Sequence, residues 1–149
     1  MTATVRLDEA SLLAEARQRT GLADFGDGSF REPLTKLVDA IEHEARLTTA
    51  GRAGQRARII GLLAARLQRQ DWLARHPEIE DERVDVRLVV VGFPRTGTTL
   101  LHRILAQDPR SSWLAWWECR HPAPAPGWQV EEARDRPDPR IARAEAEAA

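Results

Sequence analysis

The stretch of residues 88–105 constrains the fold most, because it joins an apolar run, a glycine-bounded loop and a helical pattern. The run Leu88–Val91 has the length and the β-branched content of a buried parallel strand. Gly92 and Gly97 bound the loop, and apolar residues recur at helical spacing from Leu100 onward. A strand, a tight loop and a helix in this order place several backbone N–H groups at one helix N-terminus. Because these amides and the helix dipole favour negative charge, the stretch predicts a loop that binds phosphate-like anions.

The residues after the second glycine indicate which kind of anion the loop suits. The glycine spacing matches a nucleotide-binding P-loop, but a Walker A loop continues with lysine, which reaches the terminal phosphates. Thr98 and Thr99 stand here instead, Arg95 is the only cation inside the loop, and Lys36 is the only lysine of the chain. A P-loop nucleotide kinase or NTPase stays open as an alternative that needs another cation. The loop better suits an anion of lower charge, held by amides, two hydroxyls and one guanidinium.

The loop also resembles that of a known family. Its residues resemble the 5′-phosphosulfate-binding loop of sulfotransferases that use 3′-phosphoadenosine 5′-phosphosulfate (PAPS); they are Pro94, Arg95, Thr96, Gly97, Thr98 and Thr99. The flanking segments are similar to the bacterial branch of that family, and they comprise residues 23–27, 101–109, 117–118 and 138–144. The resemblance therefore runs over most of the chain.

The resemblance implies a fold and an activity. The implied fold class is α/β, with a P-loop-like parallel sheet covered by helices on both faces and preceded by an N-terminal helical segment. The implied activity is sulfuryl transfer from PAPS to a hydroxyl or amine of a small-molecule or lipid acceptor, without a metal. The residues from Pro94 to Thr99 would bind the co-substrate, and Arg95 would also be catalytic. The family's general base and its 3′-phosphate site lie beyond the matching positions of this chain.

Capping signals and periodicity predict three helices in the first half of the chain. Asp8 can cap a helix that ends at Thr20, before a glycine. Ser29 and Glu32 have the spacing of a capping box for a second helix. A third helix follows residues 48–54 and ends near Arg75, before a His-Pro pair. Residues 1–83 are therefore expected to form the N-terminal helical segment.

The second half is expected to begin the α/β domain, over residues 84–149. Val84–Val91 is predicted as the first strand. Trp113–Trp116 fits either a second, short strand or the start of a helix, and the strand is favoured. Prolines make the segment 120–139 an extended connection. Asp138 and Pro139 supply an N-cap and an N1 proline for a last helix.

One or two strands are too few for a parallel sheet, which is normally buried on both faces. The chain is therefore expected to be the N-terminal portion of a longer protein and to be inactive alone. A non-catalytic anion-binding fragment is the third open hypothesis.

Aromatic and histidine residues of the second half have less specific interpretations. Trp113, Trp116 and Trp117 are expected to pack in a core or against a sheet edge, and alternatively to border the acceptor or the adenine. His121 has no visible partner in the sequence. Histidines, carboxylates and Cys119 show no metal-ligand spacing, so no metal is expected.

Composition excludes several classes of function. A net charge of -1 gives no electrostatic footprint for nucleic acid. The single cysteine fits a reducing compartment. No apolar run approaches the ~18 residues of a transmembrane helix, and the acidic pair near the N-terminus does not suit a signal peptide. A cytoplasmic protein is therefore expected.

Overall fold

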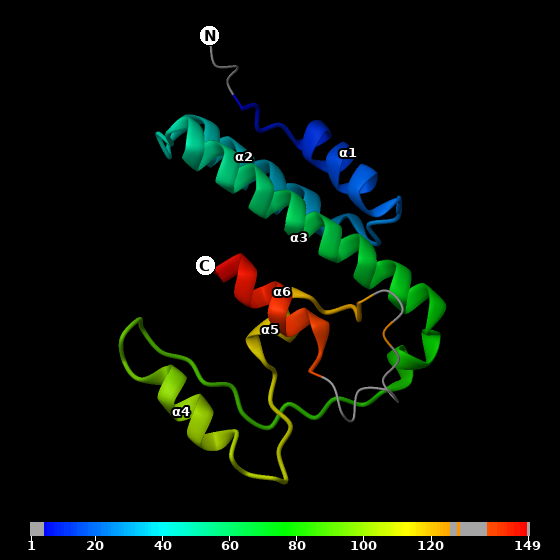
Figure 1. Cartoon of the computed structure of the whole chain (residues 1–149), viewed down its shortest axis with the longest axis vertical. Coiled ribbons are helices and arrows are strands. Elements are labelled where there is room, and N and C mark those ends of the chain that lie inside the picture. Colours follow the sequence, from blue (N-terminus) through cyan, green and yellow to red (C-terminus); the bar gives the residue numbers. More distant parts are fainter. Residues whose placement is uncertain (1–4, 126–127, 129–136, 149) are drawn as a thin grey trace.

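The computed structural model describes residues 5–125, 128 and 137–148 of the 149-residue chain, and every regular element in that part is helical. α1 and α2 lie along the first part of the long helix α3, α5 and α6 pack together near its middle, and α4 lies apart (Figure 1). The helices are α1 (Glu9–Thr20), α2 (Arg31–His43), α3 (Thr49–Arg75), α4 (Thr98–Leu105), α5 (Trp116–Arg120) and α6 (Pro139–Ala148). Two short 3₁₀ helices are η1 (Gly28–Phe30) and η2 (Pro77–Asp81).

Local signals fix both ends of α1, as predicted. The Asp8 carboxylate accepts a hydrogen bond from the Ser11 N–H at 2.9 Å and so caps the helix. Gly21 ends it in the left-handed region, with φ of 71°, and its N–H donates to the Arg17 carbonyl at 2.8 Å. A residue with a Cβ is strained at this φ, which explains the glycine.

The starts of the next two helices differ from the predictions. The Ser29–Glu32 capping box was wrong: Asp27 accepts a hydrogen bond from the Ser29 N–H instead, and η1 then leads into α2. The third helix begins at Thr49, earlier than predicted, because the Thr48 hydroxyl accepts a hydrogen bond from the Gly51 N–H at 3.1 Å. A good N-cap therefore outweighs the low helix propensity of the glycines that follow it.

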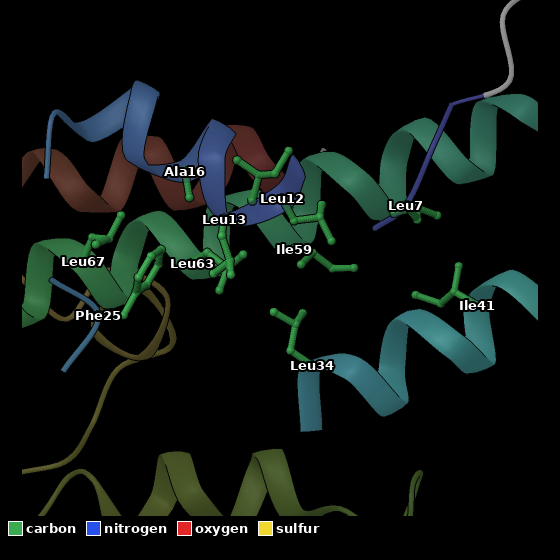
Figure 2. Packing of buried hydrophobic residues seen from close by; sticks show 11 residues of the cluster. Leu7, Leu12, Leu13, Ala16, Phe25, Leu34, Ile41, Ile59, Leu63 and Leu67 are labelled. Carbon is green, nitrogen blue, oxygen red and sulfur yellow. The ribbon is translucent and has the colours of Figure 1, made fainter. Parts of the chain in front are cut away.

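The hydrophobic core lies between α3 and the two helices before it (Figure 2). The buried face of α3 consists of Ile59, Ile60, Leu63 and Leu67. The residues that complete the cluster come from α1, α2 and the segments beside α1, and are Leu7, Leu12, Leu13, Ala16, Phe25, Leu34 and Ile41. Polar contacts reinforce this packing, since Arg56 of α3 pairs with Glu15 of α1 at 2.8 Å.

The predicted α/β fold with a parallel sheet was wrong for the part of the chain that the structure describes. Residues 82–93 have no regular structure, and Val84 and Val91 are 80% and 85% exposed. A strand exists only where neighbouring strands accept and donate its backbone hydrogen bonds, and no described segment pairs with this one. The strand predicted from the apolar pattern is therefore absent from the described residues.

The favoured prediction of a strand at Trp113–Trp116 was also wrong, and the alternative of a helix start is correct. Residues 113–115 have no regular structure, and α5 begins at Trp116. Its start is fixed by Glu118, whose carboxylate accepts a hydrogen bond from the Ala115 N–H at 2.6 Å. This bond from the backbone of Ala115 to the side chain of Glu118 is a local signal for the start of a helix. It outweighs the β propensity of the tryptophans.

The start of the last helix, α6, was predicted correctly. It begins at Pro139, and the Asp138 carboxylate accepts a hydrogen bond from the Arg140 N–H at 2.9 Å. Much of the proline-rich connection, residues 126–127 and 129–136, lies outside the described residues. The division into residues 1–83 and 84–149 stays a prediction. Among the described residues, no helix is both long and apolar enough to cross a membrane.

Candidate functional site

The loop before α4 contains two residues in the left-handed region of backbone conformation. Arg95 has φ of 69° and Gly97 has φ of 84°. Arginine in this region costs roughly 1–2 kcal/mol, so an ordinary surface turn would not favour it. The two residues turn the chain sharply from the extended segment into the helix, and successive backbone N–H groups in such turns form anion-binding concavities.

Gly92, at the start of the loop, lies very close to the side chains of Thr96 and Thr98 at its end. A Cβ at this position would lie 2.7 Å from Thr98 Cγ2 and 2.9 Å from Thr96 Oγ1, closer than real Cβ atoms come to other atoms. The Thr96 hydroxyl is itself held inside the loop, because it donates to the Phe93 carbonyl at 2.6 Å. Only glycine therefore fits at the start of the loop without displacing its threonines.

The N-terminus of α4 has no side-chain cap. Its N-cap residue is Gly97, and the first intrahelical bond runs from the Leu101 N–H to the Gly97 carbonyl at 3.0 Å. The amides of Thr98, Thr99 and Leu100 precede that bond and have no intrahelical acceptor. These donors and the positive end of the helix dipole suit an anion at the mouth of the loop.

The side chains of the predicted site residues are accessible to a ligand. Arg95 and Thr99 are exposed, and Thr98 is half-buried in the first turn of α4. No ion pair joins Arg95 to another described residue, so its guanidinium is available to an external anion. The structure thus gathers the six predicted residues, Pro94 to Thr99, in one loop and the first turn of one helix.

No group of three or more histidines, cysteines or acidic residues placed to hold a metal ion occurs in residues 5–125, 128 and 137–148. The loop itself supplies amide, hydroxyl and guanidinium donors. Such a donor set binds phosphate or sulfate oxygens rather than cations.

Comparison with known proteins identifies the class to which this loop belongs. A family model described as the sulfotransferase family matches residues 87–148, which contain the loop and α4 to α6. Sulfotransferase STF1 from Mycobacterium tuberculosis is 34% identical, with a TM-score of 0.80 over 96% of this chain and 39% of that protein. Sulfotransferase STF9 from Mycobacterium avium is 33% identical, with a TM-score of 0.79 over 99% of this chain and 36% of that protein.

All of these matches are sulfotransferases. Over nearly its whole length the chain is similar to the first part of these sulfotransferases, and the family model supports the same assignment for its second half. It spans less than two fifths of the length of the two mycobacterial structures. No curated protein matches the chain.

Sequence analysis missed a second concave region. A cavity of about 480 Å³ lies between α1, α3 and the α5–α6 pair. Its lining residues are Arg19, Gly54, Ala57, Arg58, Gly61, Leu62, Trp116, Arg120, His121, Arg143 and Glu147. These residues lie between Arg19 and Glu147 along the chain, so no contiguous sequence motif predicts the cavity. The only signals in the sequence were the tryptophan cluster and a histidine with no visible partner.

Proposed function

We propose that this protein is a PAPS-dependent sulfotransferase whose loop, residues 92–99, binds the 5′-phosphosulfate. The acceptor would be a hydroxyl or amine of a small molecule or a lipid. The observation that carries the proposal is the uncapped N-terminus of α4 behind the left-handed turn at Arg95 and Gly97. The close approach at Gly92 supports it, because a glycine at this position lets Thr96 and Thr98 pack against the start of the loop and so fixes the shape of the turn.

The residues of the loop would have different roles in sulfuryl transfer. The amides of Thr98 and Thr99 would donate to the phosphate oxygens and orient the group. PAPS supplies a sulfuryl group on a phosphate, which can pass in line to an acceptor oxygen or nitrogen. Arg95 would donate to the oxygen that bridges phosphorus and sulfur. That oxygen takes the electron pair as its bond to sulfur breaks, so the guanidinium stabilises the transition state more than the ground state.

A general base must also take the proton of the acceptor as the new bond to sulfur forms. No residue is assigned as this base. Arg95 and the helix amides would neutralise the developing charge, which is the role of the lysine and Mg²⁺ in a Walker A loop.

The test is the affinity for adenosine 3′,5′-bisphosphate, measured by isothermal titration calorimetry without added metal. Arg95→Ala should weaken binding by about 10- to 100-fold, the range for a lost hydrogen bond to a charged group. Arg103→Ala is the matched control, because Arg103 is an exposed arginine of α4 outside the loop, and its affinity should equal that of the wild type. Equal affinities of all three proteins would refute the assignment of the loop. Binding of ATP that requires Mg²⁺ would favour the kinase or NTPase alternative.

A further inference from the structure

The cavity between α3 and the α5–α6 pair has a floor of small residues. Gly54, Ala57 and Gly61 lie on one face of α3, at helical spacing, and all three line the cavity. Figure 1 shows α5 and α6 beside the middle of α3. The three residues carry little or no side chain, so they leave space for the cavity on this face of α3. A volume of about 480 Å³ is within the usual range of small-molecule sites.

Positive charge exceeds negative charge on the walls of the cavity. Four arginines line it, one from each of the four surrounding helices, and Glu147 is the only acidic residue that does. Glu147 is shared, since it accepts from Arg120 at 2.8 Å and from Arg143 at 3.3 Å. Arg58 forms no ion pair with any described residue. Arg19 pairs with Glu15 at 2.6 Å, outside the lining. Four guanidinium groups therefore face two carboxylates, those of Glu15 and Glu147.

Two buried polar atoms on this wall lack hydrogen-bond partners among the described residues. They are His121 Nε2 and Arg120 Nε. His121 is 7% exposed, and the Glu147 carboxylate lies 3.5 Å from its Nε2 without forming a hydrogen bond. Buried polar atoms are nearly always satisfied in folded proteins, so these two atoms are candidate partners for a polar group of a ligand.

An apolar surface adjoins the arginines. Trp116 is 55% exposed and Leu62 is 49% exposed, although both are large apolar side chains. The Arg120 guanidinium lies 5.9 Å from the centre of the Trp116 ring, which places charge and aromatic surface next to each other. The cavity thus offers cationic donors on one side and an apolar wall on the other.

We propose that this cavity binds a small organic anion, in which a carboxylate, phosphate or sulfate group is joined to an aromatic or aliphatic body. The arginines hold the acidic group, and Trp116 with Leu62 covers the body. None of the loop residues 92–99 lines the cavity, so this site is distinct from the proposed 5′-phosphosulfate site and does not depend on it.

The test is calorimetric titration of the whole chain with 2-naphthoate, and with 2-naphthamide as a neutral molecule of the same shape. We expect 2-naphthoate to bind at least about tenfold more tightly, because only its charge uses the arginines. Arg58→Ala should weaken 2-naphthoate binding by at least about tenfold. Since Arg58 is exposed and unpaired among the described residues, its loss should leave the far-ultraviolet circular dichroism spectrum unchanged.

Two control variants test whether 2-naphthoate binds in the cavity and not elsewhere on the chain. Arg69→Ala is the matched control, because Arg69 is an exposed arginine of α3 that does not line the cavity, and it should bind 2-naphthoate like the wild type. Arg95→Ala should also bind it like the wild type. Equal affinity for the two naphthalene compounds, or an unchanged affinity in Arg58→Ala, would overturn the proposal. Loss of binding in Arg95→Ala alone would place the anion in the loop and would overturn it as well.

Discussion

The substitution Leu67→Ala tests whether the hydrophobic core is packed against the buried face of α3. Leu67 is 0% exposed, and Figure 2 shows it in the cluster with Leu63 and Phe25. The substitution removes three carbon atoms, which at about 0.8 kcal/mol each amount to about 2.4 kcal/mol of transfer free energy. A residual cavity of about 50 Å³ would add about 1.2 kcal/mol. The free energy of unfolding should therefore fall by about 3–4 kcal/mol, a large part of the stability of a small domain.

The assay is urea denaturation followed by far-ultraviolet circular dichroism. The midpoint should move to lower urea while the slope stays constant, because the surface exposed on unfolding hardly changes. Leu62→Ala is the matched control on the same helix; Leu62 is 49% exposed, so its loss should cost less than about 1 kcal/mol. Equal losses in the two variants, or a larger loss at Leu62, would refute the packing of α3 described above.

Three other predictions concern the loop, a helix cap and a buried histidine. Gly92→Ala should weaken adenosine 3′,5′-bisphosphate binding by at least about tenfold in calorimetry, whereas Gly61→Ala, where a Cβ meets nothing within 4 Å, should not; equal affinities would contradict the close approach. Asp8→Ala should lower the free energy of unfolding by about 1 kcal/mol in urea titrations, through loss of the α1 cap, and an unchanged midpoint would refute this. Burial, and then the charge of Arg143, hold the pKa of His121 below its ordinary value of about 6.5, so the unfolded chain takes up this proton first as pH falls. Stability should therefore decrease as pH falls through about 6.5, and His121→Gln should lose less stability than the wild type between about pH 7 and 5.5; identical pH profiles would contradict this origin.

The helix ends that could be predicted have local signals. Asp8 and Gly21 act within one turn of α1, and the proline at 139 acts on the helix that it begins. The start of α3 was missed because Gly51 lies in its first turn and was taken for part of a loop. The sheet could not be inferred safely from Val84–Val91, because strand pairing depends on distant segments and not on the apolar run itself.

The two candidate sites differ in how far the sequence can reveal them. The loop from Pro94 to Thr99 is contiguous, so its glycine spacing and its arginine are visible in the sequence itself. What the sequence could not give is the left-handed conformation of Arg95, which follows from the geometry of the turn. The arginine-lined cavity draws residues from four helices between Arg19 and Glu147, and only folding brings them together.

The exposed extended segment has a consequence for handling the protein in solution. Residues 88–91 are four consecutive apolar residues without charge, and Val84, Val86, Leu88 and Val89 are each more than 60% exposed. Such a segment presents free backbone donors and acceptors together with β-branched side chains, which are the requirements for edge-to-edge aggregation. Asp85 and Arg87 are the charges that oppose it at one end. Self-association of the chain should therefore begin at this segment and grow with protein concentration, while the helical core stays folded.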